Sequence, residues 1–383
     1  MSEELGLESE LLLKTERLRA GDAGGVARAA ELLRAGGTVA FPTETVYGLG
    51  ANALNSAAVA KIFLAKQRPA WDPVIVHVEG RAMLQQVAVV PAGDEGLVVA
   101  RLMGAFWPGP LTLLLPRTAA VPDSVTAGRP LVGVRSPAHP VARELIRLAG
   151  VPVAAPSANR FGRTSPTTAA HVLADLDGRI DAVLDGGATS VGVESTVLDV
   201  AARAIYRPGA VTAEMIADVI GEEVRVVVGV EEVGVEEEGE ADSSAASRKQ
   251  ASSPGTPTTL RNDKQERRDD ERAGLASPGM GTRHYAPRAR LVLVAGQEEL
   301  LREVVHHTAN EVGVMLPDGW NAGGAKAVFR WGAWNNAEAL ARRLFAGLRE
   351  LDVRGVKVIV CPVPEMGGLG EALRDRLEKA ARS

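Results

Sequence analysis

The segment that most restricts how this chain can fold is FPTETVYGLGAN, which begins at Phe41 and follows a β-type run at 38–41. Pro42 donates no backbone hydrogen bond, and Gly48 and Gly50 follow it. The strand therefore cannot continue as a regular ladder or run smoothly into a helix. The resulting turn carries three hydroxyl groups and one carboxylate, from Thr43, Thr45, Tyr47 and Glu44. Such a turn after a strand is a common place for a ligand in an α/β sheet, although a decorated structural loop explains the segment equally well.

Length and composition allow two globular domains and argue against several classes of protein. The chain has 383 residues, of which 46% are hydrophobic, enough for two well-filled cores. A formal net charge of −5 argues against a polycation built to bind nucleic acid, but it leaves room for a local basic patch. The single cysteine, Cys361, excludes an intramolecular disulfide and favours a packing role. An acidic start and the lack of a long apolar stretch lead us to expect a soluble cytoplasmic protein without a membrane partner.

Strand and helix patterns alternate to about residue 228 and predict an α/β fold. Helices are expected at 22–35 with Asp22 as the cap, at 56–66 with Ser56 as the cap, at 95–106 and at 141–149. Strands are expected at 38–41, 74–78, 111–115 and 131–135. Long loops rich in proline and glycine favour an irregular, twisted sheet over a regular βαβ repeat.

The segment from about 229 to 276 differs in composition from the rest of the chain. Glutamates cluster between Glu231 and Glu240, and polar or charged residues dominate to Arg272. Such a segment buries too little apolar surface to offset the entropy lost on ordering, so we expect a disordered linker. An acidic tether for a basic partner is the alternative interpretation.

A second regular pattern begins at Arg290 and predicts a smaller domain. Strands are expected at 291–295, 312–316, 327–329 and 356–360, and helices at 297–308, 336–351 and 371–381. The alternation favours a small parallel sheet of Rossmann-like topology. No GxGxxG follows its first strand, so we expect no dinucleotide there.

Further motifs place polar residues at the ends of the predicted elements. They are KIFLAKQRP, DPVIVHV, FWPGPLTLLLP, VTAGRP, LVGVRSPAHP, VAAPSANRFGRTSPT, GVESTVLDV, YRPGAV and SPGMGTRHYAP. Lys66-x-Arg68 precedes Ser157-x-Asn159, with FPTETVYGLGAN before both and HYAP after both. On these residues the chain resembles the Sua5/YrdC/YciO family, in its two-domain Sua5 form. The resemblance assigns 14–228 to a YrdC-like catalytic domain, 229–289 to a linker ending in a HYAP lid segment, and 290–383 to a Sua5 C-terminal domain.

The resemblance implies both a fold and a reaction. The fold is a twisted mixed sheet with a large concave cavity, beside a smaller Rossmann-like domain. The reaction joins L-threonine, bicarbonate or CO₂, and ATP into threonylcarbamoyl-AMP and pyrophosphate, for N6-threonylcarbamoyladenosine in ANN-decoding tRNAs. A separate threonylcarbamoyl transferase would act downstream. This nucleotidyltransferase chemistry needs enclosure, positioning and charge neutralisation but no protein nucleophile. Accordingly, none of Ser157, Ser165 and Ser195 lies in a G-x-S-x-G elbow.

By resemblance, two sets of residues would bind the substrates. ATP would contact Lys66, Arg68, Thr126, Ser157, Asn159, Ser165, Arg207 and Tyr285. L-Threonine would contact Thr43, His77, Arg135, Ala155 and Ser195, with Arg135 on its carboxylate and Ala155 contributing only backbone. Tyr285 would belong to a lid that excludes water. Ordinary structural interpretations also stand: solvated charges for the Lys-Arg pair, a salt bridge for Arg135, a core residue for His77, and packing at a domain entry for Tyr285.

One position departs from the family pattern. Asn usually stands before the proline that follows Lys-x-Arg, and Asp72 stands there in this chain. A carboxylate beside a triphosphate repels it unless Arg68 or a metal intervenes, so two roles stay open for Asp72: a place near the nucleotide, or Mg²⁺ binding. We otherwise expect Mg²⁺ to arrive with ATP, held largely by phosphates and water, and no metal bound by protein alone.

Two other functions fit parts of the sequence. Relatives of the catalytic domain have been linked to double-stranded RNA, so an RNA-binding or ribosome-associated factor is one alternative. The negative net charge and the scarcity of aromatic residues, 4% of the chain, count against it. A carbamoyl-transfer enzyme with a related cavity is the other. The lack of Cys-rich zinc modules and the presence of HYAP and a second domain argue against it.

Overall fold

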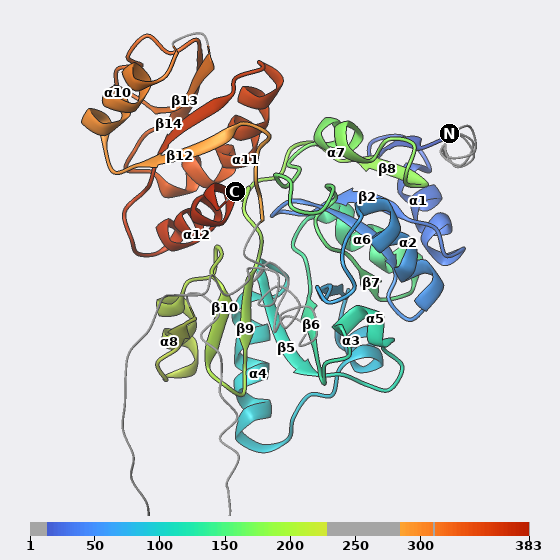
Figure 1. Ribbon diagram of the computed structural model, residues 1–383. Helices are drawn as coiled ribbons and strands as arrows, with labels where there is room; N and C mark the ends of the chain where they lie inside the picture. Colours follow the sequence, from blue (N-terminus) through green and yellow to red (C-terminus); the bar gives the residue numbers. More distant parts are fainter. Residues whose placement is uncertain (1–13, 228–283, 309–310, 383) are drawn as a thin grey trace, which may run out of the picture.

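The computed structural model describes residues 14–227, 284–308 and 311–382 (Figure 1). The predicted disordered linker and its acidic run lie outside the described residues. Within these ranges, no helix combines the length and the hydropathy that crossing a bilayer requires.

Residues 14–227 form one large mixed sheet. Its strands, in their order across the sheet, are β1 (Glu16–Arg19), β8 (Ala182–Asp185), β2 (Val39–Pro42), β3 (Tyr47–Asn52), β7 (Val153–Ala154), β4 (Val76–His77), β6 (Leu131–Arg135), β5 (Leu111–Pro116), β9 (Thr196–Asp199), β10 (Ala204–Arg207) and β11 (Arg225–Val226). The sheet contains parallel pairs, such as β5 with β9, and antiparallel pairs, such as β2 with β3. The predicted twisted mixed sheet is confirmed.

Helices cover both faces of this sheet because successive strand residues point to opposite sides. The helices are α1 (Gly25–Arg34), α2 (Ser56–Lys66), α3 (Arg81–Val87), α4 (Gly93–Phe106), α5 (Asp123–Thr126), α6 (Pro140–Ala149), α7 (Ala169–Leu176) and α8 (Ala213–Ile220). Phe41 of β2 packs in a cluster with Leu33 of α1 and Ile146 of α6. Its neighbour Ala40 belongs to the other cluster, which includes Ile62 of α2 and residues of α4 and α8.

Two of the predicted helix caps are wrong. Helix α1 begins only at Gly25, and its N-cap Gly24 has φ of 85°, a conformation that favours glycine over Asp22. In α2, Ser56 is already the first helical residue, and the side chain of Asn55 caps the helix by accepting from the Ala58 amide at 3.1 Å.

The C-terminal part forms a separate parallel sheet, as the strand and helix alternation predicts. Its order is β12 (Arg290–Val294), β15 (Val358–Pro362), β13 (Val312–Pro317) and β14 (Ala327–Gly332). Helix α10 (Gln297–His306) packs on one face, and α11 (Ala337–Val353) and α12 (Leu369–Ala381) pack on the other. Cys361 is fully buried in this second core, in agreement with a packing role.

The two parts share a core where α11 and α12 approach the large sheet (Figure 1). Val46 and Val193 of the larger part belong to the same hydrophobic cluster as Phe345 of α11. Gly192 lies so close to α11 that a Cβ atom there would be 2.4 Å from the Ala341 carbonyl oxygen. Only glycine permits this approach, since its φ is also +87°. The smaller part is therefore packed directly onto the larger one.

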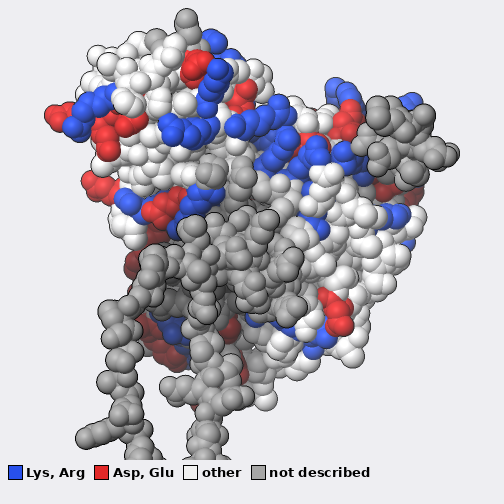
Figure 2. Space-filling model, in the orientation of Figure 1, with Lys and Arg blue, Asp and Glu red and all other residues white. Residues whose placement is uncertain are grey.

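Basic side chains gather along this junction. On the face shown in Figure 2, Lys and Arg atoms gather between the smaller part and the region of α7, and further Lys, Arg, Asp and Glu atoms lie on the outer side of the smaller part. The local basic patch that the net charge left open thus lies where the two parts meet.

Candidate active site

A cavity of about 50 Å³ brings together many of the predicted site residues. All the residues predicted for threonine line it: Thr43, His77, Arg135, Ala155 and Ser195. Arg68, Ser157, Arg207 and Tyr285, predicted for ATP, line it as well. The remaining predicted residues, Lys66, Asp72, Thr126, Asn159 and Ser165, are buried but are not part of the lining among the described residues.

Adjacent strand ends explain why His77 and Arg135 meet. Strands β4 and β6 are parallel, and His77 pairs in register with Arg135 at their C-terminal ends. Ala155 follows β7, which lies on the other side of β4. The carboxyl ends of the parallel strands β4 and β6 meet, whereas β7 runs antiparallel to β4, so Ala155 lies beside the start of β4 and its amide donates to the Ile75 carbonyl at 2.8 Å.

Arg135 is held in place by acceptors from the FPTETVYGLGAN turn. Its Nη2 lies 2.5 Å from Glu44 Oε1, and its Nη1 donates to Thr45 Oγ1 at 2.9 Å. Nε donates to the Gly109 carbonyl at 3.1 Å. Burial alone would raise the pKa of Glu44, but the charge of Arg135 outweighs it, and the pKa is lowered. The turn therefore carries the counter-ion that makes a buried arginine stable at the cavity wall.

The Thr43 hydroxyl serves mainly inside this turn. It donates to the Val46 carbonyl at 2.6 Å and lies 2.8 Å from Thr45 Oγ1. This is the turn-forming role that threonine commonly has. Thr43 shapes the wall, and Thr45, which sequence reasoning missed as a site residue, contacts Arg135.

His77 is a neutral imidazole in the cavity wall. Burial, and after it the charge of Arg135, lower the pKa of His77 to about 3. Its Nδ1 is buried and has no hydrogen-bond partner among the described residues. A buried polar atom without a partner costs free energy, so this nitrogen is available to a bound substrate.

The burial of His77 predicts a pH dependence of stability. The unfolded chain takes up this proton near the ordinary pKa of 6.5, whereas the folded chain takes it up only near 3. Below pH 6.5 the unfolded state binds more protons, so the free energy of unfolding falls as the pH falls, by at most about 1.4 kcal/mol per pH unit for one histidine. Urea unfolding between pH 6.5 and 5 should show a shallower slope for His77→Gln than for wild type. Exposed His306→Gln is the matched control, and equal slopes for both variants would contradict the assignment.

Arg68 lies at the cavity wall as half of a buried ion pair. Its Nη2 is 2.8 Å from Asp72 Oδ1, and it also donates to the carbonyl groups of Asp72 and Pro73. His284 Nε2 lies 3.6 Å from Asp72 Oδ2. Burial would raise the pKa of Asp72, but Arg68, His284 and Lys66 together outweigh it, and the pKa is lowered. Arg68 thus stands between Asp72 and the cavity, one of the arrangements that the sequence left open.

Lys66 links the Lys66-x-Arg68 motif to the Ser157-x-Asn159 motif by hydrogen bonds. Its Nζ donates to the carbonyl groups of Ser157 and Asn159, both at 2.5 Å. Burial, followed by the charge of Arg68, lowers the pKa of Lys66 well below its ordinary value. Asn159 Nδ2 in turn donates to the carbonyl groups of Arg160 and Arg163 at 2.9 and 2.7 Å. In this arrangement Lys66 shapes the loop that carries Ser157, and a direct contact with ATP stays a prediction.

Glu194 is the main site residue that sequence reasoning missed. It lines the cavity, accepts from Ser165 Oγ at 2.5 Å, and pairs through Oε2 with Arg376 Nε at 2.8 Å. Burial would raise the pKa of Glu194, but Arg376 and then Arg207 outweigh it, and the pKa is lowered. Glu194 directly precedes the predicted Ser195, so the GVES motif was the available signal. Its partner Arg376 on α12 gave no signal in the sequence, because Arg376 lies in another domain.

Arg207 and Ser195 form the opposite side of the wall from β9 and β10. Arg207 donates through Nε to the Ser195 carbonyl at 3.0 Å and through Nη2 to Ser195 Oγ at 3.1 Å. Ser195 Oγ also lies 2.8 Å from Thr112 Oγ1. Thr126, by contrast, sits on α5, and its buried hydroxyl has no partner among the described residues.

Tyr285 covers the cavity from the HYAP segment. Its ring stacks on Phe345 of α11 with centroids 5.7 Å apart, and its backbone has φ of 65°. This left-handed conformation is uncommon outside glycine and persists only where the surroundings hold it. Tyr285 thus lines the cavity with its ring packed on the smaller domain, and its role as a lid stays a prediction.

The cavity lining offers one carboxylate for a metal ion. Among the described residues no group of three or more His, Cys, Asp or Glu side chains could hold a metal. Glu194 lines the cavity, but both of its oxygens already accept from Ser165 and Arg376. This donor set fits an ion that brings most of its own ligands, such as Mg²⁺ bound to a polyphosphate.

The cavity as a whole suits an anionic substrate. Arg68, Arg135 and Arg207 converge on a small cavity with a neutral histidine. Charged hydrogen bonds strengthen where water is excluded. The arrangement can bind a carboxylate and phosphate oxygens together and keep a water-sensitive intermediate enclosed.

Comparisons with known proteins identify the family. A family model described as "Telomere recombination" (Sua5_yciO_yrdC) matches residues 31–209, and one described as "Threonylcarbamoyl-AMP synthase, C-terminal domain" matches 211–382. A threonylcarbamoyl-AMP synthase of Pyrococcus abyssi is 39% identical over 92% of this chain and 93% of its own length. One from Bacillus subtilis is 39% identical over 93% and 92%. The crystal structure of P. abyssi Sua5 complexed with L-threonine is similar with a TM-score of 0.77 and 37% identity, covering 96% of this chain and 97% of that one. This chain belongs to the Sua5/YrdC/YciO family, in its two-domain Sua5 form.

Proposed function

We propose that this protein is a threonylcarbamoyl-AMP synthase, a nucleotidyltransferase acting on L-threonine, bicarbonate or CO₂, and ATP. The observation that carries the proposal is the convergence of Arg68, Arg135 and Arg207 with neutral His77 in one cavity. Relatives that match over more than nine-tenths of the chain bear this name, which supports the same reaction.

Arg135 would hold the threonine carboxylate. Of the five N–H groups of a guanidinium, three already contact Glu44, Thr45 and Gly109. One N–H on each terminal nitrogen remains, which is the fork that suits a carboxylate. His77 Nδ1 would meet a polar group of the same substrate, because it is the buried atom beside Arg135 that lacks a partner.

Arg68 and Arg207 would hold the phosphates of ATP. Both are buried side chains of the cavity wall, and both lie near Tyr285. The cavity of about 50 Å³ is far below the roughly 300 Å³ at which ligand pockets usually begin, so it would hold only part of ATP.

The chemistry follows from enclosure and charge. The threonine amine attacks the carbon of CO₂, or of bicarbonate with loss of water, and gives a carbamate. A carbamate oxygen then attacks the α-phosphorus of ATP, the bond from that phosphorus to the bridging oxygen breaks, and pyrophosphate leaves. Arg68 and Arg207 would balance the charge that develops on the phosphates, while Tyr285 and His284 exclude water. Mg²⁺ would arrive with ATP and supply further charge neutralisation.

The product would supply a threonylcarbamoyl group for N6-threonylcarbamoyladenosine in ANN-decoding tRNAs. An acyl-adenylate of this kind hydrolyses readily in water, so a transferase must consume it soon after release. We accordingly propose a cytoplasmic role with a downstream threonylcarbamoyl transferase as the functional partner.

The decisive experiment supplies purified full-length protein with ATP, Mg²⁺, bicarbonate and L-threonine. We expect pyrophosphate and an adenylate of the mass of threonylcarbamoyl-AMP, both requiring threonine and bicarbonate. Arg68→Ala should reduce turnover by at least tenfold, because a charged hydrogen bond contributes about 1.5–3 kcal/mol. Exposed Arg17→Ala is the matched control. If folded protein releases pyrophosphate at a rate that does not depend on threonine, the proposal is overturned. Salt-sensitive RNA binding without turnover would favour the RNA-binding alternative.

A further inference from the structure

Ser165 is linked to two arginines of the smaller domain, to one directly and to the other through Glu194. It lies in the loop that enters α7 and does not belong to the smaller domain itself. One arginine reaches its backbone, and the other reaches its side chain through Glu194. The two arginines come from α11 and α12, so two separate helices act on one residue of the nucleotide side of the cavity.

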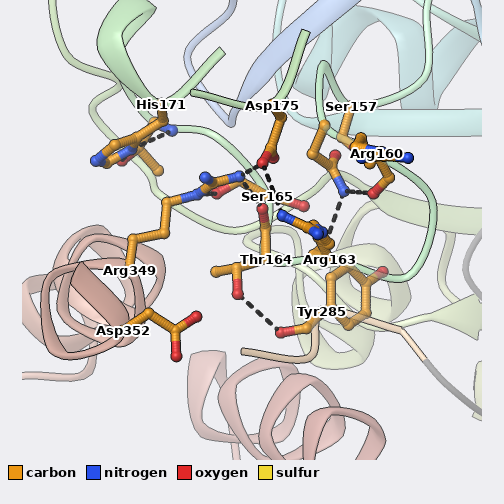
Figure 3. A network of polar contacts seen from close by, with 12 residues as sticks. Ser157, Arg160, Arg163, Thr164, Ser165, His171, Asp175, Tyr285, Arg349 and Asp352 are labelled. Carbon is orange, nitrogen blue, oxygen red and sulfur yellow. Dashed lines mark hydrogen bonds and ion pairs between the residues drawn. The ribbon is translucent and has the colours of Figure 1, made fainter. Parts of the chain in front are cut away.

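Arg349 of α11 forms the backbone contact. Figure 3 shows it reaching from its helix toward Asp175 and the loop of Thr164 and Ser165. Its Nη2 lies 2.7 Å from Asp175 Oδ2 and also donates to the Thr164 carbonyl, while Nε donates to the Ser165 carbonyl at 3.4 Å. Asp175 is itself buried in α7. A single side chain thus joins α11 to α7 and to the loop before it.

Arg376 of α12 forms the contact through Glu194. The side chain of Arg376 is fully buried, and its Nε lies 2.8 Å from Glu194 Oε2. The other oxygen of Glu194 accepts from Ser165 Oγ at 2.5 Å. Arg376 Nη1 pairs with Asp375 at 2.6 Å, and Nη2 is buried without a hydrogen-bond partner among the described residues. A buried arginine held this closely fixes the rotamer of a cavity-lining carboxylate.

The same two helices hold the lid residue Tyr285. Its ring lies between Phe345 of α11 and the guanidinium carbon of Arg376, which is 5.3 Å from the ring centroid. Its carbonyl accepts from Thr164 Oγ1 at 3.3 Å, and Thr164 is the residue whose own carbonyl Arg349 contacts. The lid, the Ser165 loop and Glu194 are therefore joined to one another through the smaller domain.

The interface beside Arg349 is not closely packed. A cavity of about 460 Å³ lies there, lined by α7 and the residue before it, Thr168, by α11 residues such as Ala346, and by Ala286 of HYAP and Arg288 after it. Close packing of side chains would fix the position of α11 relative to α7. Beside this open space, that position depends on directed polar contacts such as those of Arg349. Removing Arg349 should then loosen the Ser165 loop without collapsing a hydrophobic core.

From these contacts we propose that Arg349 and Arg376 are positioning residues, through which the smaller domain sets the ATP side of the cavity. This inference rests on the proposed synthase function and deepens it. Ser165 and Tyr285, which the arginines position, belong to the set predicted for ATP. Arg135 and His77 are predicted to bind threonine. Neither of them contacts Arg349 or Arg376. The two substrates should therefore respond differently when the arginines are changed.

The test compares Arg349→Ala and Arg376→Ala with wild type in the full-length enzyme. We expect the KM for ATP to rise at least fivefold in each, and the KM for threonine to change by less than twofold. Arg376→Lys should recover part of the loss, because lysine keeps the charge beside Glu194. Hydrogen exchange of the segment 284–289 should be faster in both alanine variants, because Arg376→Ala removes the cation beside the Tyr285 ring and Arg349→Ala frees Thr164, whose hydroxyl donates to the Tyr285 carbonyl.

Arg374→Ala is the matched control, as a partly exposed arginine of the same helix α12 whose Nη2 donates to Pro364. If Arg376→Ala fails to fold, the neutral pair Glu194→Gln with Arg376→Gln and the single variant Arg349→Ala carry the test. A uniform loss of turnover with unchanged KM for ATP and unchanged exchange would overturn the proposal, because it would mean only less folded protein. A wild-type enzyme without threonine-dependent turnover would instead refute the synthase function, while the exchange measurement would still report on the lid.

Discussion

Replacing Arg135 by glutamine is expected to weaken threonine binding by about 100-fold and to destabilise the protein by about 3–5 kcal/mol. The first effect follows because the substrate carboxylate loses a charged, forked donor, and such hydrogen bonds contribute about 1.5–3 kcal/mol each. The second follows because Glu44, buried beside Arg135 at 2.5 Å, would keep its charge without a partner. Calorimetric titration with threonine and urea unfolding measure the two effects separately.

The double variant Glu44→Gln with Arg135→Gln separates the two roles of Arg135. Removing both charges should restore much of the stability, since no buried charge then lacks a partner. Threonine binding should stay lost, because the glutamine pair offers no cation. Recovery of binding together with stability would mean that Arg135 acts only as a structural counter-ion of Glu44.

Replacing Gly209 by alanine is expected to inactivate the enzyme by displacing the wall that carries Glu194 and Ser195. A Cβ atom at residue 209 would lie 2.4 Å from the Thr196 amide nitrogen and 2.7 Å from the Glu194 carbonyl oxygen. These are backbone atoms, which cannot rotate away as a side chain can. Overpacking of this kind costs about 1–3 kcal/mol, and the strain falls on two residues of the cavity lining. Turnover and urea unfolding of the same preparation test the prediction.

Gly104→Ala is the matched control for this glycine. Gly104 is exposed in the interior of α4, and a Cβ atom there meets nothing within 4 Å. Alanine favours a helix over glycine by up to about 1 kcal/mol, so this variant should be slightly more stable and fully active. Unchanged turnover in Gly209→Ala would show that the start of β9 can shift without disturbing the cavity.

The motifs along the chain and their order predicted many of the residues that line the cavity. Thr43, His77, Arg135, Ala155 and Ser195 could be chosen from sequence because each stands at a strand end or turn in a recognisable motif, and the structure lines one cavity with all of them. Strand pairing accounts for their meeting, since parallel β4 and β6 end side by side. One sequence could not supply that register, because pairing depends on segments far apart in the chain.

The sequence was less informative about which atoms each charged group contacts. Lys66 and Arg68 were chosen together as phosphate ligands, yet Lys66 contacts the carbonyl groups of Ser157 and Asn159, and Arg68 pairs with Asp72. A basic pair two residues apart after a helix gives no indication of which buried acceptors will surround it. The same limit left Asp72 undecided until its distance to Arg68 was known.

By itself the sequence determined the α/β class, the small parallel sheet, the family, and a set of residues that line one cavity. Local hydrophobic periodicity and motifs of adjacent residues encode these features, and they need no knowledge of distance. The tertiary structure alone decided that Glu194 belongs to the site and that Arg349 and Arg376 reach it from the smaller domain. The physical reason is that a buried charge is stable only beside a partner. That partner, nearly two hundred positions away along the chain, is brought within 3 Å only when α12 packs against the large sheet.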